Sequence, residues 1–456
     1  MPTNSSICQG PVSRREFLQI GTLALGGISL ADVLAGRAAA GTGNRDTSVI
    51  MLYQHGGASQ LETYDLKPQA PVEFRSIYQP IATNVPGMEI CEKFPLQAQL
   101  ADKFSLVRSL HHDVGIHSDG GIVVLTGKRP LVLDPTSRSK SEHPDFGMIA
   151  GKLRGIGENG VPNYICVPQV PYMTTPGYLG VEYAGYAVSD PGKEGYAPPS
   201  LKISAERSAD QIVDRRKLLA QFDRFQREWD LRQNMERVDK FREMAFEMMT
   251  NPATREAFDI AQEPADLRER YGKNTWGQSC LLARRLAEAG TAVVNIYFDT
   301  PKSGQEFTNW DDHIMNAGRP GHFGKFMDIR LPYMDQALAT LIEDIHARGL
   351  DKKILVVVVG EFGRTPRLSK NAVGVGRDHW PQAYSALISG GGFKMGQVIG
   401  ATNSKSEYPA ERPYTPQDFL ATIYHHLGID NYQAFDDYSG RPIPILPYGN
   451  VISELI

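Results

Sequence analysis

The run Ile354–Val359 constrains the fold of this chain more than any other segment. It is apolar throughout, and Val356–Val359 is continuously β-branched. Successive side chains on a strand point to opposite faces, so this run needs apolar cover on both sides. Such a pattern is typical of a central strand in a parallel sheet that carries helices on both faces.

Further short apolar runs, bounded by turn residues, predict the neighbouring strands. Helical patterns separate them. Leu331–Arg348 is one, and Thr415–Leu427 is another, with Pro416 at its first position, Asp418 as a partner for the N-cap threonine, and Gly428 as its stop. The alternation predicts a doubly wound, mostly parallel α/β sheet. The other predicted strands are Ser48–Tyr53, Ser105–Arg108, Thr291–Phe298 and Tyr384–Ser389.

The first 40 residues have the order of an export signal. A twin-arginine motif, Ser13–Leu18, precedes the apolar, uncharged run Ile20–Leu30, and the small residues Ala38–Ala40 follow. We expect residues 1–40 to be a twin-arginine signal peptide and the protein to be periplasmic or extracellular. The alternative is a chance arginine pair before an amphipathic helix, and whether the signal is cleaved stays open. This route carries folded proteins, which favours a metal acquired before export.

The mature chain is predicted to be one large domain, residues 45–452, with a helical insertion at 204–290. The part Ser204–Thr250 is charged and almost free of Gly and Pro. It is interpreted either as a coiled-coil arm for dimerisation or as helices packed on their own domain, so the oligomeric state stays open. No other stretch is long and apolar enough for a stable membrane span.

Charge and cysteine content exclude several classes of protein. The formal net charge is −4 and no basic tract occurs, so a nucleic-acid partner is not expected. Cys91, Cys166 and Cys280 are widely spaced and form no CxxC pair. They are either three buried thiols or one disulfide with one free thiol.

In open α/β sheets, ligands bind beyond the carboxyl ends of the strands. His55 follows the first predicted strand, and Glu361 and Arg364 follow the central one. A buried glutamate is costly unless it is paired or bound to a metal. We predict His55 and Glu361 as metal ligands and Arg364 as a clamp for an oxyanion. The alternatives are a hydrogen-bonded histidine in a turn and a structural Glu361–Arg364 salt bridge.

A cluster of histidines and aspartates follows the strand at 105–108. His117 and Ser118 lie where a helical turn begins, and both are candidate catalytic residues. Free amides and the helix dipole at such a position favour an anion or an alkoxide. Ser118 is therefore either a nucleophile or an ordinary helix cap. The cluster comprises His111, His112, Asp113, His117 and Asp119.

Two further pairs combine carboxylate oxygen with imidazole nitrogen. Asp311 and His313 are two residues apart on a predicted loop, and Asp378 and His379 are adjacent. These donors suit one or two divalent ions, Zn²⁺ or Mn²⁺ above all. His425–His426 lies within a predicted helix, where adjacent side chains point about 100° apart, so we interpret this pair as structural.

These segments resemble the DUF1501 family, which is usually placed with the alkaline phosphatases and sulfatases. The motif Gly-Glu-Phe-Gly-Arg-Thr-Pro is the most specific match. The matching pieces are the twin-arginine start, His55–Gly57 with Ser59–Asp65, Tyr271–Gly272 with Cys280–Glu288 and Gly290, Gly360–Arg367, Arg377–Pro381 and Asp418–Asp430.

The resemblance implies a sheet of the alkaline phosphatase-like type whose strand ends hold two divalent metals around a nucleophile. By position, Asp311, His313 and His379 match metal ligands, and Glu361 stands where those enzymes have an Asp-His pair. Ser118 is the nearest match to the nucleophile. His55 departs from the pattern, because an aspartate usually ends the first strand. No sulfatase-type Cys-x-Pro-x-Arg motif is present, which argues against a formylglycine sulfatase.

Two functions from different classes follow. The first is an exported, metal-dependent hydrolase of sulfate or phosphate esters, acting on a small molecule or a polysaccharide. Its nucleophile would be Ser118 or a metal-bound water. The second is a non-catalytic surface or glycan-binding protein that keeps the fold and binds through the tyrosine-rich loop Tyr172–Tyr196.

Overall fold

The computed structural model describes residues 46–155, 160–196, 251–302, 309–316, 319–320 and 323–456. Its centre is an eight-stranded sheet in which five of the seven neighbouring pairs are parallel, and β15 runs antiparallel to both its neighbours. This confirms the predicted sheet. In spatial order the strands are β16 (Val398–Ile399), β4 (Phe104–Leu110), β15 (Tyr384–Gly390), β10 (Ile354–Val359), β1 (Ser48–Tyr53), β7 (Val293–Tyr297), β5 (Tyr164–Val167) and β6 (Tyr186–Ala187).

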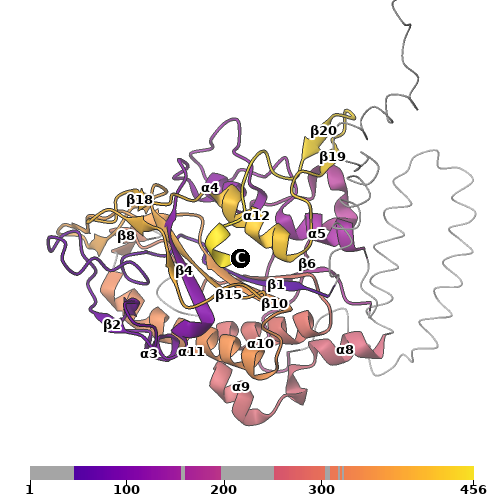
Figure 1. The fold of residues 1–456 in the computed structure, drawn as a ribbon, viewed down its shortest axis with the longest axis horizontal. Helices are drawn as coiled ribbons and strands as arrows, with labels where there is room; N and C mark the ends of the chain where they lie inside the picture. Colours follow the sequence, from indigo (N-terminus) through magenta and orange to yellow (C-terminus); the bar gives the residue numbers. More distant parts are fainter. Residues whose placement is uncertain (1–45, 156–159, 197–250, 303–308, 317–318, 321–322) are drawn as a thin grey trace, which may run out of the picture.

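The central strand β1 shows why the sheet needs cover on both faces. Ile50 and Leu52 belong to one apolar core, whereas Val49, Met51 and Tyr53 belong to the other, and all are buried. Helices lie on each face (Figure 1). The first core is lined by α3 (Pro95–Ala98), α8 (Pro252–Phe258), α9 (Ala265–Tyr271), α10 (Thr275–Glu288) and α11 (Phe323–Ala347), and the second by α4 (His117–Thr126), α5 (Phe146–Arg154) and α12 (Pro416–His426).

The predicted helices are present, and one boundary was wrong. Helix α12 begins after Thr415, whose side chain and that of Asp418 form the predicted capping box. Helix α11 begins at Phe323 instead of Leu331 and contains Pro332. An interior proline costs a helix about 3 kcal/mol. We infer that burial of the first turns against the core outweighs that cost.

Other predictions fall partly outside the described residues. The signal peptide and the segment 204–250 lie there. Helix α10, at the end of the predicted insertion, packs against β1 and β7 as part of the core. Cys91, Cys166 and Cys280 are buried free thiols, which confirms three buried thiols over a disulfide with one free thiol. No described helix is both long and apolar enough to cross a membrane.

Candidate metal centre

The candidate site lies where the carboxyl ends of the central strands meet. His55 follows β1, Glu361 follows β10, and Asp311 comes from the loop after β7. His117 is the first residue of α4, which follows β4, and His379 begins the short strand β14 (His379–Trp380). Parallel strands end at one edge of a sheet, so distant parts of the chain meet there. Two groups of side chains converge, each with its ligand atoms within 4.8 Å of one another. Both combine predicted metal ligands with His117, which the sequence predicted as a catalytic residue.

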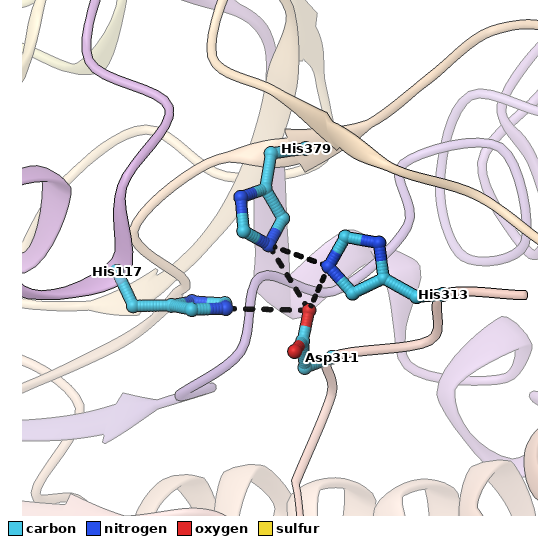
Figure 2. A group of neighbouring side chains, drawn as sticks. All are labelled: His117, Asp311, His313 and His379. Atoms are coloured by element: carbon cyan, nitrogen blue, oxygen red, sulfur yellow. Dashed lines mark hydrogen bonds and ion pairs between the residues drawn. The ribbon is translucent and has the colours of Figure 1, made fainter. Parts of the chain in front are cut away.

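The first group surrounds a single carboxylate oxygen, Asp311 Oδ1 (Figure 2). The Nε2 atom of His313 lies 2.8 Å from it, that of His379 3.1 Å and that of His117 3.2 Å. Three imidazoles from separate segments thus direct the same ring nitrogen to one point. Imidazole and carboxylate are the usual ligands of zinc and similar divalent ions.

The opposite nitrogen of each ring is fixed by a hydrogen-bond partner. His379 Nδ1 lies 2.7 Å from the Gly115 carbonyl oxygen, to which it can only donate. His313 Nδ1 lies 2.7 Å from Asp378 Oδ1, and His117 Nδ1 lies 2.7 Å from Glu361 Oε1. Metal-binding histidines are commonly held in this way, since the bond at Nδ1 leaves the Nε2 lone pair free for the ion.

The close approach of two ring nitrogens tests whether a cation fits. His313 Nε2 and His379 Nε2 are 2.9 Å apart. If both rings donate from Nδ1 and are neutral, two lone pairs face each other at this distance. A proton or a metal ion between them removes the repulsion. The residues of the first group therefore fit a divalent cation.

The pKa values of the site residues reflect the close approach of their ionisable groups. Burial alone would raise the pKa of Asp311, but hydrogen bonds from His117, His313 and His379 hold it far below its usual range. Burial lowers the pKa of His117, and the bonds to Asp311 and Glu361 outweigh this effect and raise it to about 9. Without a metal, His117 therefore holds a proton at neutral pH. A cation bound at Nε2 must displace that proton.

The second group comprises His55, His117 and Glu361. Glu361 is fully buried, and its Oε1 accepts the backbone amide of Gly56 at 2.7 Å. Burial raises the pKa of Glu361, but the hydrogen bond from His117 and the charge of His55 bring it to about 2. The carboxylate stays ionised at neutral pH, as a ligand must.

The turn after β1 depends on glycine. Gly56 has a φ of 105°, and a side chain there would meet the Asp311 amide nitrogen at 2.5 Å. The Trp310 amide donates to the His55 carbonyl at 3.0 Å across the same contact. Glycine at this position therefore lets the loop that carries Asp311 lie directly on the turn that carries His55.

The structure corrects the prediction that Arg364 clamps a substrate. Its side chain is fully buried, and its nitrogens donate to the carbonyls of Gly56, Gly57 and Arg377 and to Asp311 Oδ1, the last at 2.6 Å. A guanidinium with these partners is not free to bind an anion. The alternative pairing with Glu361 is also wrong, since Arg364 pairs with Asp311 instead.

The structure also corrects the role of Asp378 as a ligand. Its carboxylate binds Nδ1 of His313, and the two nitrogens of an imidazole point in different directions. Asp378 therefore orients His313 and does not share its cation.

Ser118 lies at the start of α4, as predicted, but it is buried and its hydroxyl donates to Asp119 Oδ2 at 2.7 Å. Its role as nucleophile stays a prediction.

Sequence reasoning missed two groups, Asp299 and the Gly115 carbonyl, and found a third, His112, only as a member of the predicted cluster. Asp299 lies 3.4 Å from His55 Nδ1. It directly follows the predicted strand, and that position was its only signal. The Gly115 carbonyl that orients His379 has no sequence signal at all. His112 Nε2 contacts the Glu361 carbonyl at 2.6 Å, and Val114 donates to its Nδ1, so this ring supports the loop of Glu361 from behind.

Fold and site together define an α/β protein with a mostly parallel sheet, whose strand ends gather histidines and carboxylates in an arrangement that fits a cation. The chain belongs to the DUF1501 family, described as a protein of unknown function, whose model matches residues 46–456. This confirms the family resemblance.

Similar solved structures include sulfatases and members of the alkaline phosphatase superfamily. The PsFucS1 sulfatase from Pseudoalteromonas sp. is 11% identical, with a TM-score of 0.34, and the match covers 92% of this chain and 72% of that one. The phosphonate monoester hydrolase SpPMH from Silicibacter pomeroyi is 12% identical, with a TM-score of 0.37, and the match covers 86% and 75%. Likeness at this level carries no argument about function. No curated protein matches the chain.

Proposed function

We propose that the chain is an exported, metal-dependent hydrolase of sulfate or phosphate esters. The observation that carries the proposal is the convergence of three imidazole Nε2 atoms on Asp311 Oδ1, with the opposite nitrogen of each ring fixed by a partner. Such a set is prepared for a cation before the cation arrives.

The ligands divide between the two groups in a way that suits catalysis. His117 belongs to both groups, so three ligands belong to the first position alone: Asp311, His313 and His379. Catalytic zinc sites have three protein ligands and keep a fourth place for water or substrate. The chemistry supplied by a divalent ion there is polarisation of the phosphoryl or sulfuryl oxygens. We therefore infer a catalytic cation in the first position, with Zn²⁺ as its preferred ion.

The chain's own residues would position the reaction. Arg364 holds Asp311 against the turn at Gly56 and so keeps the ligand oxygen in place. Ser118 or a water molecule is the candidate nucleophile. The substrate is an ester of a small molecule or a polysaccharide, and export by the twin-arginine route would place the enzyme in the periplasm or outside the cell.

The test combines metal content with turnover. We expect the purified chain to contain bound Zn²⁺ or Mn²⁺ and to hydrolyse nitrophenyl sulfate or nitrophenyl phosphate. His379→Ala should lose the cation of the first position and the activity together. Asp335→Asn is the control, because Asp335 is a buried carboxylate that accepts the amides of Leu96 and Gln97 outside the site. Bound metal without turnover of any ester would support the non-catalytic, glycan-binding alternative.

A further inference from the structure

A cavity of about 530 Å³ lies between the segment that follows β6 and the helices α8, α9 and α10. These helices lie together on one face of the sheet (Figure 1). None of the predicted metal ligands lines the cavity. Its described lining includes two aromatic and four cationic side chains, which are Tyr196, Phe258, Lys193, Arg255, Arg268 and Lys273.

The cavity carries more positive than negative charge. Against its four cations, the carboxylates among its described lining residues are Glu194 and Asp259. Asp259 is already engaged, since its Oδ1 accepts the amide of Ala261 at 3.0 Å. Lys193 and Arg255 form no ion pair with another described residue. A local excess of cations on a chain with a net charge of −4 favours an anionic ligand.

Arg268 has the free guanidinium that Arg364 lacks. Gln278 is buried, and its Oε1 accepts from Arg268 Nε at 3.3 Å while its Nε2 donates to the Arg268 carbonyl at 3.0 Å. These bonds orient the side chain and leave both terminal nitrogens without a partner among the described residues. The terminal nitrogens of Arg364 are used by carbonyls and Asp311. An oriented, unpaired guanidinium can bind a sulfate or phosphate group through two hydrogen bonds.

The Tyr196 side chain adds a polar group and an apolar ring. Its hydroxyl is buried and has no hydrogen-bond partner among the described residues. A buried polar atom without a partner costs about 1–3 kcal/mol, so a ligand that hydrogen-bonds there is favoured. The ring packs, partly buried, against the first core. A sugar offers both hydroxyls and apolar C–H faces, which match a phenol of this kind, whereas an inorganic anion would use only the cations.

The cavity lies beside the loop that carries Asp311. Gly192 lines the cavity, and a side chain there would meet the Thr275 amide nitrogen at 2.6 Å. The next residue of α10, Trp276, stacks on Trp310 with ring centroids 5.8 Å apart. Trp310 directly precedes Asp311. The first turn of α10 therefore joins the cavity wall to the loop of the candidate metal centre.

We propose that this cavity binds an anionic saccharide, a sugar unit that carries a sulfate or phosphate group and belongs to the same chain as the ester at the metal centre. The inference narrows the substrate of the proposed function to a polysaccharide with several anionic groups. It rests on the proposed function for the hydrolysis of that polysaccharide. The binding itself needs no turnover.

The experiment measures binding separately from hydrolysis. The probe is a fluorescent sulfopropyl-dextran oligosaccharide, whose sulfonates keep the charge but are not esters and so resist the proposed activity. The purified full chain is titrated with it, and fluorescence anisotropy gives Kd. Unlabelled dextran sulfate and dextran phosphate then compete, and the stronger competitor identifies the preferred anion.

The variants test individual side chains of the cavity. Arg268→Gln should weaken binding of the probe about tenfold, because a charged hydrogen-bond donor is lost. Lys193→Gln should weaken it about threefold, since an exposed charge is screened by water and salt. Arg270→Gln is the matched control on the same helix, where Arg270 pairs with Glu343 outside the cavity, and its Kd should equal that of the wild type.

Several outcomes would overturn the proposal. Equal affinity for unsubstituted dextran means that the cations do not contribute, and unchanged affinity in Arg268→Gln means that the probe binds elsewhere. Equal competition by a DNA oligonucleotide means that any polyanion binds. Should Arg268→Gln fail to fold, Arg255→Gln tests the cavity from the exposed side of α8. Binding of the probe without turnover of any ester would refute the proposed function and leave this inference standing, whereas ester turnover without binding would do the reverse.

Discussion

The two groups of candidate ligands differ in how firmly the protein orients them. Around Asp311, each ligand ring is held from behind by Gly115, Asp378 or Glu361 before any ion is bound. Around Glu361, the two ring nitrogens of His55 and Asp299 Oδ1 lack hydrogen bonds among the described residues, and His55 Nδ1 and Asp299 Oδ1 form only a loose ion pair at 3.4 Å. The comparison teaches that hydrogen bonds orient the rings of the first group in the absence of an ion, whereas the second group lacks such support.

The largest expected effect comes from Asp311→Asn. Asp311 Oδ1 is the point that all three imidazoles and Arg364 share. An amide keeps the shape but removes the charge that binds a cation. Turnover of a nitrophenyl ester should fall roughly a thousandfold, since a metal contributes several kcal/mol to transition-state stabilisation. Bound metal measured by elemental analysis should fall with it, and unchanged turnover would contradict the proposed metal chemistry.

A smaller effect is expected from Asp378→Asn. Asp378 is largely exposed and touches the first position only through His313. Loss of such a supporting carboxylate typically weakens metal binding by about 10–100-fold. Calorimetric titration with Zn²⁺ should show this weakening without loss of stoichiometry. A stoichiometric loss would restore Asp378 as a ligand, as the sequence predicted.

The smallest expected effect concerns the free energy of unfolding of the metal-free chain at acidic pH. His426 is buried outside the site, with Nε2 3.0 Å from the Ser48 carbonyl, and burial lowers its pKa to about 4. Between that value and its ordinary pKa, the unfolded chain binds a proton that the folded chain does not. Stability should therefore fall as the pH drops through this window, by about 1.4 kcal/mol for each pH unit.

His426→Gln removes this contribution while it keeps a group that can donate to Ser48. Chemical denaturation of the metal-free chain at pH 7 and pH 5 measures the difference. The variant should lose less stability than the wild type over this interval. Equal losses would place the acid sensitivity in other groups.

The sheet could be predicted because its strands carry their own signals. Ile354–Val359 and Ser48–Tyr53 are strands with the predicted boundaries, since each needs burial on both faces. The start of α11 could not be predicted, because Pro332 is a local signal to stop and the burial that overrides it comes from distant residues. Local chemistry and tertiary packing conflict there, and packing prevails.

The candidate site could be predicted in its ligand types but not in its connections. His55, Asp311, His313, Glu361 and His379 were found because each follows a strand or forms an oxygen–nitrogen pair. The partners of Arg364 could not be found, since three of them are backbone carbonyls and carry no residue type. Asp378 was misassigned for a similar reason, because its orientation relative to His313 is absent from the sequence.

The burial of Arg364 has a consequence for the sign of the electrostatic potential at the candidate site. Its single positive charge is paired with Asp311, whereas Glu361 and Asp299 add two further negative charges when they are ionised. The metal-free site has the charge of Arg364 and the proton on His117 against three carboxylates, so it would repel an anionic ester. One divalent ion that displaces this proton would only neutralise the site. Attraction would require a second ion. The affinity for an anionic substrate should therefore depend more steeply on metal loading than the rate of bond cleavage does.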